Sequence, residues 1–119
     1  MVCKRKIKMN YRKYKQLLKN ADIIPEEIYI EMVKWDINIF CSMEKKNQTK
    51  RICLEACKQN GNAIFYTYNQ TEEMCLEAVK QNGYALQYVK EQTENICIEA
   101  VKQNKGVLRF VNFKFQHLF

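Results

Sequence analysis

Apolar and polar positions repeat along most of the chain with a period of 22 residues. Residues 71–92 are identical to the following 22 residues at 11 positions and to the preceding 22 at 12. Unrelated segments of this length would agree at about one or two positions, so the sequence contains internal repeats. Within each unit, apolar residues recur at helical spacing over about 10 residues that end at Q-N, and then over a shorter segment. Each unit therefore predicts two short helices joined by a tight turn.

Start and stop signals place the helices within the units. A threonine that can accept a hydrogen bond from a first-turn N–H begins each of the three clear units: Thr49, Thr71 and Thr93. Gly61 and Gly83 follow the longer helix, where a glycine in the left-handed conformation commonly ends a helix. Lys105 occupies this place in the last unit and Gly106 follows it, so we expect that turn to shift by one residue. The shorter second helices are predicted over residues 63–68, 85–90 and 107–112.

Residues 25–48 follow the same apolar pattern and form a divergent first unit. Pro25 suits the first position of a helix, because its missing N–H would have no helical partner there. Glu26 and Glu27 follow in the first turn, where the helix dipole favours negative charge. Lys50 and Arg51 occupy the equivalent positions of the next unit, so we expect a weaker helix start there.

A pair of short helices cannot bury its apolar faces alone, so neighbouring pairs are expected to stack. The pattern predicts an all-α fold, a short α-solenoid of tandem helix-turn-helix repeats. A compact bundle of the same helices without regular stacking is the alternative. The apolar tail F-K-F-Q-H-L-F either folds back as a cap or remains exposed, which would allow the chain to form a homo-oligomer. The predicted repeat domain, residues 25–119, comprises this tail and units at about 25–48, 49–70, 71–92 and 93–114.

Charge separates residues 1–24 from this repeat domain. Residues 1–24 contain eight basic residues and one acidic residue, whereas residues 25–119 contain 12 of each. One amphipathic capping helix is predicted in the basic segment by its apolar residues Tyr11, Tyr14, Leu17 and Leu18.

The basic segment has three interpretations: a capping helix with a solvated face, a contact to nucleic-acid phosphates, or a contact to an anionic membrane surface. The membrane contact is disfavoured because the segment is short and lacks Trp and Phe. The candidate phosphate contacts are Lys4, Arg5, Lys6, Lys8, Arg12, Lys13, Lys15 and Lys19.

Six cysteines do not indicate a disulfide scaffold in this chain. The N-terminus lacks the apolar run of a secretory signal, and no apolar run approaches the ~20 residues of a membrane-spanning helix. We therefore expect an intracellular protein with reduced thiols, which is not secreted and has no transmembrane segment. Cys53, Cys75 and Cys97 recur in one position of helices that would stack about 8–10 Å apart, too far for thiolates to share an ion. We predict buried structural thiols, no metal site and no cofactor.

Residues with catalytic potential are scarce. His117 is the only histidine and Ser42 the only serine, and the sequence has no glycine-rich loop that would cradle phosphates. The carboxylates are explained by helix starts and surface pairs. The sequence therefore predicts that the protein is not an enzyme.

The repeated polar residues have two interpretations. Glu55, Glu77 and Glu99 each precede a lysine by three positions, as surface ion pairs on helices often do. Alternatively, stacking turns one position of the repeat into a row that a protein partner contacts. The candidate interaction stripe consists of Lys58, Gln59, Lys80, Gln81, Lys102 and Gln103.

The runs I-C-L-E-A-C-K-Q-N-G, M-C-L-E-A-V-K-Q-N-G and I-C-I-E-A-V-K-Q-N resemble a family of "domain of unknown function" repeats. This family is abundant in giant DNA viruses of amoebae, especially mimivirus relatives. The resemblance covers residues 49–111 well and residues 25–48 weakly, and it implies tandem helical repeats without an established activity. We expect a non-enzymatic helical-repeat protein that mediates protein–protein interaction. The alternatives are a nucleic-acid-contacting protein that uses the basic segment and a structural, self-assembling virion component.

Overall fold

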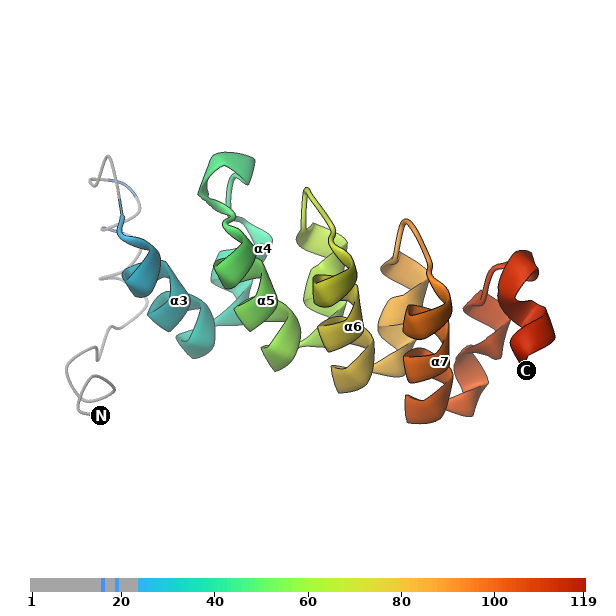
Figure 1. Cartoon of the computed structure of the whole chain (residues 1–119). Helices are drawn as coiled ribbons and strands as arrows, with labels where there is room; N and C mark the ends of the chain where they lie inside the picture. The colour runs from blue at the N-terminus through green and yellow to red at the C-terminus, as the bar shows by residue number, and fades with distance from the viewer. Residues whose placement is uncertain (1–15, 17–18, 20–23) are drawn as a thin grey trace.

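The computed structural model describes residues 16, 19 and 24–119, and the described chain is helical (Figure 1). No strand occurs among these residues, and none of their helices is long and apolar enough to cross a bilayer. The four longer helices are α3 (Glu26–Trp35), α5 (Lys50–Gln59), α6 (Glu72–Gln81) and α7 (Glu94–Gln103). The shorter elements are α4 (Ile37–Cys41) and the 3-10 helices η1 (Lys45–Asn47), η2 (Gly61–Tyr66), η3 (Gly83–Tyr88), η4 (Lys105–Phe110) and η5 (Phe113–Leu118).

The helix predicted in the basic segment lies outside the described residues, except for Gln16 and Lys19. These two residues are helical and exposed. Of the candidate phosphate contacts, the structure therefore describes Lys19 alone.

The longer helices lie side by side in one row, and the shorter ones form a second row behind it (Figure 1). Helix α5 contacts both α3 and α6, and α6 contacts α7. The 3-10 helix η2 contacts α5, α6 and η3, and η3 contacts α6, α7 and η4, so these two elements bridge neighbouring units. The molecule measures 51 × 27 × 20 Å and is longest in the direction in which the helices follow one another.

The threonine caps are confirmed. The hydroxyls of Thr49 and Thr71 each accept a hydrogen bond at 3.2 Å from the third residue of their helix, and Thr93 does the same at 3.3 Å. Pro25 lies one residue before α3 rather than at its first position, because its ψ of 146° is extended. Helix α5 begins at the same place as its neighbours and has the same length, although Lys50 and Arg51 are basic.

The second helices differ from the prediction in type and position. They are 3-10 helices that begin at residues 61, 83 and 105, two residues earlier than expected. An asparagine with extended backbone separates each of them from the preceding α-helix. The Asn60 side chain accepts a hydrogen bond from Asn62 N at 3.0 Å, and Asn104 accepts one from Gly106 N at 2.8 Å. This local bond starts the 3-10 turn directly after the α-helix.

The predicted left-handed glycines are wrong, because no described glycine has a positive φ. Gly61 and Gly83 are instead positions where the next unit approaches closely. A Cβ at Gly61 would overlap the carbonyl oxygen of Ala78 in α6, and a Cβ at Gly83 would lie 2.8 Å from that of Ala100 in α7. Among the described elements no α-helix packs after η4, so Lys105 occupies the same place without a shift of the turn.

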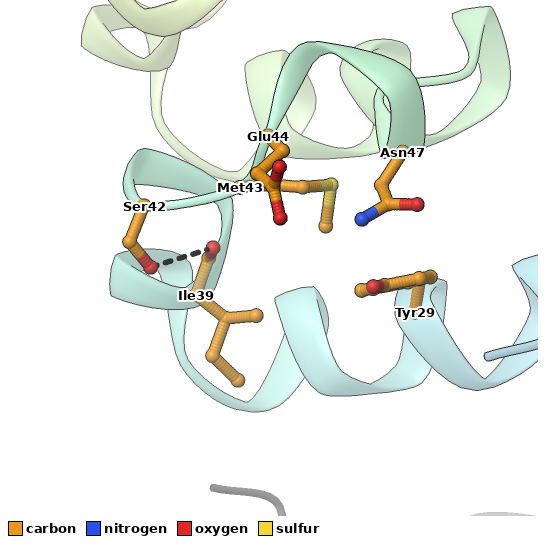
Figure 2. Close-up of a pocket in the computed structure, with 6 residues that line it drawn as sticks. All are labelled: Tyr29, Ile39, Ser42, Met43, Glu44 and Asn47. Carbon is orange, nitrogen blue, oxygen red and sulfur yellow. Dashed lines mark hydrogen bonds between the residues drawn. The ribbon is translucent and has the colours of Figure 1, made fainter. Parts of the chain in front are cut away.

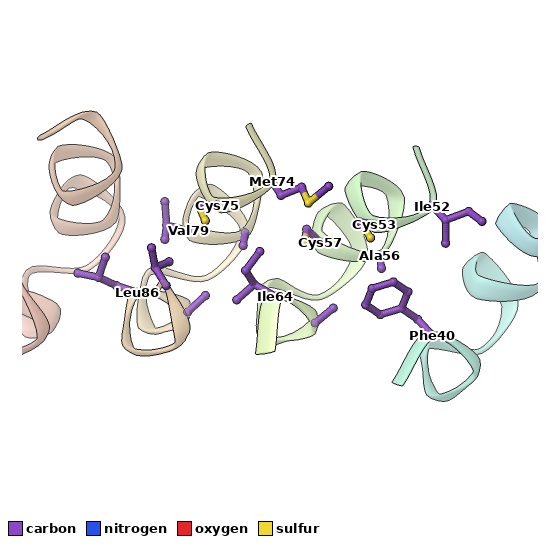
Figure 3. Close-up of a cluster of buried hydrophobic side chains, with 14 of the residues drawn as sticks. Phe40, Ile52, Cys53, Ala56, Cys57, Ile64, Met74, Cys75, Val79 and Leu86 are labelled. Atoms are coloured by element: carbon purple, nitrogen blue, oxygen red, sulfur yellow. The ribbon is translucent and has the colours of Figure 1, made fainter. Parts of the chain in front are cut away.

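One continuous core runs between the two rows, from Tyr29 to Val111, and Figure 3 shows its middle part, from Phe40 to Leu86. Ile64 of η2 and Leu86 of η3 stand at the same position of successive units, and both are fully buried. Burying a side chain of this size contributes about 1.5–3 kcal/mol. Because η2 contacts both α5 and α6, this burial holds adjacent units together.

The apolar tail forms η5. Part of the tail folds back as a cap and part remains exposed, so both predicted outcomes occur. Phe115 is partly buried against the core, whereas Phe113 is 90% exposed. The Gln116 amide donates a hydrogen bond to Val111 O at 3.2 Å. The tail therefore covers part of the last unit and leaves Phe113, Leu118 and Phe119 exposed to solvent.

Candidate interaction surface

The glutamines of the candidate stripe hold neighbouring units together. Gly61 N donates to Gln81 Oε1 at 2.6 Å, and Gly83 N donates to Gln103 Oε1 at 2.7 Å. The Gln59 amide lies 3.2 Å from both the backbone N and the backbone O of Lys34. Each of these amides therefore contacts the backbone of the unit before its own.

The lysines of the stripe lie at the surface. Lys58, Lys80 and Lys102 are all exposed at the carboxyl ends of successive helices. The predicted ion pair forms between Lys102 and Glu99 at 3.7 Å, but Lys58 and Lys80, both in the described chain, lack it. Contact of these lysines with a partner stays a prediction.

A second row of glutamines was not identified from the sequence. Gln70 donates to Tyr88 O at 2.9 Å and accepts from Lys90 N at 2.9 Å. Gln48 and Gln92 make the equivalent pair of bonds. These three residues recur every 22 positions, and this spacing was the signal that could have revealed them.

Charges alternate along the amino-terminal ends of the row. Arg51 pairs with Glu27 and, at 3.5 Å, with Glu26, both in α3. On the other side, Lys50 lies 2.9 Å from Glu73 of α6. The hydrogen bond from Arg51 holds the pKa of Glu27 below its ordinary value. The basic pair of α5 therefore meets acids from both neighbouring units, which favours this order of stacking.

The thiols of the repeat are buried, as predicted. Burial raises the pKa values of Cys53 and Cys75 to about 11 and that of Cys57 to about 12. Nucleophilic attack and metal ligation need the thiolate, so these groups are unreactive near neutral pH. Within the described residues, no group of three His, Cys, Asp or Glu side chains is placed to hold a metal ion.

A pocket of about 190 Å³ lies between α3, α4 and η1 (Figure 2). Its lining includes Tyr29, Met43 and Ser42, whose hydroxyl donates to Ile39 O at 3.3 Å. Ser42 lies in the first unit, whereas His117 lies in η5 at the opposite end of the molecule (Figure 1). The structure therefore does not bring the two together.

Two further grooves lie between successive loops. One of about 200 Å³ is lined by Gln48, Cys53 and Tyr68, and one of about 440 Å³ is lined by Tyr68, Cys75 and Glu91, among others. One lysine, Lys90, and two glutamates, Glu72 and Glu91, line the larger groove, so charges of both signs occur there.

The 3-10 helices present large apolar side chains to solvent, a surface that the sequence reasoning did not identify. Phe65 is 59% exposed, and Tyr66, Leu108 and Tyr84 are 37–42% exposed. Phe65 contacts Tyr88 of the next unit edge-to-face, with ring centroids 5.1 Å apart. We call this surface the aromatic face and define it by Phe65, Tyr66, Tyr84, Tyr88, Leu108 and Phe110. Aromatic residues at equivalent positions 66, 88 and 110 were the available signal.

A family model matches the chain twice, over residues 49–92 and 71–116, and its description is "Domain of unknown function (DUF4116)". The two matches share residues 71–92, the central unit of the repeat. No curated protein and no solved structure matches the chain.

Proposed function

The chain belongs to the family of the domain of unknown function DUF4116, and we propose that it is a non-enzymatic helical-repeat protein that binds another protein. Its architecture in this proposal is a short α-solenoid. The single row of α-helices, the glutamine contacts between units and the overlapping family matches support it. Stacked repeats provide extended surfaces on which equivalent positions align.

The aromatic face is the observation that carries this proposal. Soluble monomers rarely expose neighbouring large apolar side chains unless these contact a partner. Tyr, Phe and Arg are enriched at protein–protein interfaces, and Arg109 lies next to Phe110 on this face. The buried thiols and the separation of Ser42 from His117 offer no comparable support for catalysis.

Affinity capture with the full chain tests the proposal. The chain is immobilised, incubated with nuclease-treated lysate of its source cells, and crosslinked before mass spectrometry. We expect one protein to be recovered at near-stoichiometric yield, and less of it with the Phe65→Ser variant. Lys46→Glu serves as the control, because this exposed residue lies outside both the aromatic face and the basic segment. Recovery of nucleic acid alone from untreated lysate would contradict the proposal.

Nucleic-acid binding is the second candidate function, favoured by the excess of basic residues in the first 24 positions. It predicts an affinity that falls steeply as salt rises and that is lost when residues 1–20 are deleted. Titration of a labelled oligonucleotide at several salt concentrations measures both effects.

A self-assembling virion component is the third candidate. It combines the resemblance to giant-virus repeats with the exposed Phe113 in the tail. An intracellular location is part of all three proposals, and the five described cysteines support it because all are free thiols.

A further inference from the structure

The rings of the aromatic face pack against one another within and between units. Phe65 packs edge-to-face against both Tyr66 and Tyr88, each at 5.1 Å between ring centroids. Tyr84 of η3 packs in the same way against Phe110 of η4, at 6.2 Å. Because these pairs connect successive units, the rings are held by the same stacking that builds the core. Binding to such a surface loses little side-chain entropy.

Charge is distributed unevenly along this face. The elements η2 and η3 contain no charged residue, and η2 to η5 contain no carboxylate. Their basic residues are all in the last two elements: Lys105, Arg109 and Lys114. The Arg109 guanidinium lies 4.9 Å from the centroid of the Phe110 ring, so its charge borders the aromatic side chains directly. The face is therefore apolar and uncharged at one end and basic at the other.

This distribution favours a protein segment over a nucleic acid. A single strand of nucleic acid carries a phosphate at every nucleotide and needs cations along its whole path. The neutral stretch over η2 and η3 does not provide them. A peptide with apolar residues at one end and carboxylates at the other, in either order, matches both ends of the face. Helices stack about 8–10 Å apart, so three units span roughly the length of six extended residues.

We propose that the aromatic face binds a short segment of a partner protein that carries large apolar side chains at one end and Asp or Glu at the other. The apolar side chains contact the rings of η2 and η3. The carboxylates pair with Arg109, which is exposed on η4 and borders the Phe110 ring. This inference rests on the proposed protein-binding function and specifies the chemistry of its partner.

Selection from a random peptide library on the immobilised full chain tests the proposal without a known partner. We expect the enriched peptides to combine an apolar cluster with Asp or Glu at one end. Phe65→Ser and Arg109→Glu are each expected to weaken a selected synthetic peptide about tenfold. Lys46→Glu, a charge reversal of an exposed lysine of η1 outside both the face and the candidate stripe, should change the affinity less than about twofold. A peptide with Lys in place of its carboxylates should recover binding to the Arg109→Glu variant.

Three outcomes would overturn the proposal. The first is enrichment of basic or uncharged peptides. The second is an affinity that is unchanged by Phe65→Ser and Arg109→Glu while thermal unfolding shows both variants folded. The third is an oligouridine of about 15 nucleotides that binds this face more tightly than any selected peptide at about 0.15 M salt. If affinity capture still recovers a protein in the second case, the protein-binding function stands and only this surface assignment fails.

Discussion

A glycine is required at position 61 because the next unit packs closely against it, and not because of its backbone conformation. Its φ is not positive, and a side chain there would meet the backbone carbonyl of Ala78. Backbone cannot move aside as the end of a flexible side chain can. The cost of any larger residue at this position therefore falls on the contact between η2 and α6.

Replacing Gly61 or Gly83 with alanine is expected to lower the free energy of unfolding by about 1–3 kcal/mol, because the added methyl group overpacks the contact between units. Gly106→Ala is the matched control, since its Cβ would meet only side-chain atoms, the nearest at 3.1 Å. Urea denaturation measures all three variants. Equal losses at Gly61 and Gly106 would contradict this role.

The buried thiols make the stability of the fold sensitive to alkaline pH. Burial raises the pKa of Cys57 to about 12, so the folded state keeps a proton that the unfolded state loses above its lower, ordinary value. The stabilisation is complete below about pH 8.5 and is lost progressively as pH rises toward 12.

Cys57→Val should therefore flatten the decline in the free energy of unfolding between about pH 8.5 and 10. Valine is a compatible replacement, because Val79 and Val101 occupy this position in the next two units. Chemical denaturation at several pH values measures the slope. An unchanged slope in the variant would show that this thiol does not contribute.

At the scale of elements, amides of two glutamine rows connect each unit to the next. Gln70 and its equivalents bind backbone groups at the end of the 3-10 helix in the following unit. Gln81 and Gln103 bind the first residue of the 3-10 helix in the preceding unit. A short 3-10 helix has few hydrogen bonds of its own, and these contacts supply partners for backbone groups at both of its ends. The glutamines therefore stabilise the second row of helices.

Gln70→Ala is expected to destabilise the protein by about 1–3 kcal/mol, because the partly buried carbonyl of Tyr88 would lose its partner. Gln87→Ala is the control, since Gln87 is exposed and bonds only to Tyr84 O of its own helix. Hydrogen exchange at the Lys90 amide should accelerate in the first variant alone. Equal protection of Lys90 in both variants would contradict the role of Gln70.

At the scale of the molecule, the row of units has a defined carboxyl end. Internal units present Gly61 and Gly83 to the next α-helix, but Lys105 occupies this place in the last unit. The position of Gln70 and Gln92 is likewise taken by Lys114. The last described unit therefore lacks both the glycine and the glutamine by which an internal unit contacts the next one. Helix η5 lies at this end instead.

We expect the purified chain to sediment as a monomer over a wide concentration range, because another copy cannot extend the row at this end. Sedimentation velocity measures the mass at each concentration. A concentration-dependent increase in mass that disappears in the Phe113→Ser variant would instead support the self-assembling candidate, with the exposed ring as its contact.

The sequence by itself determined the period, the four long helices and the three threonine caps. These features depend on residues a few positions apart, whose spacing is visible along the chain. The role of the glycines and the glutamine contacts were decided only by the tertiary structure. Each depends on groups about 20 residues apart, such as Gly61 N and Gln81 Oε1, that meet when units stack. The aromatic face arises for the same reason, because rings such as Phe65 and Tyr88 become one surface only in the folded row.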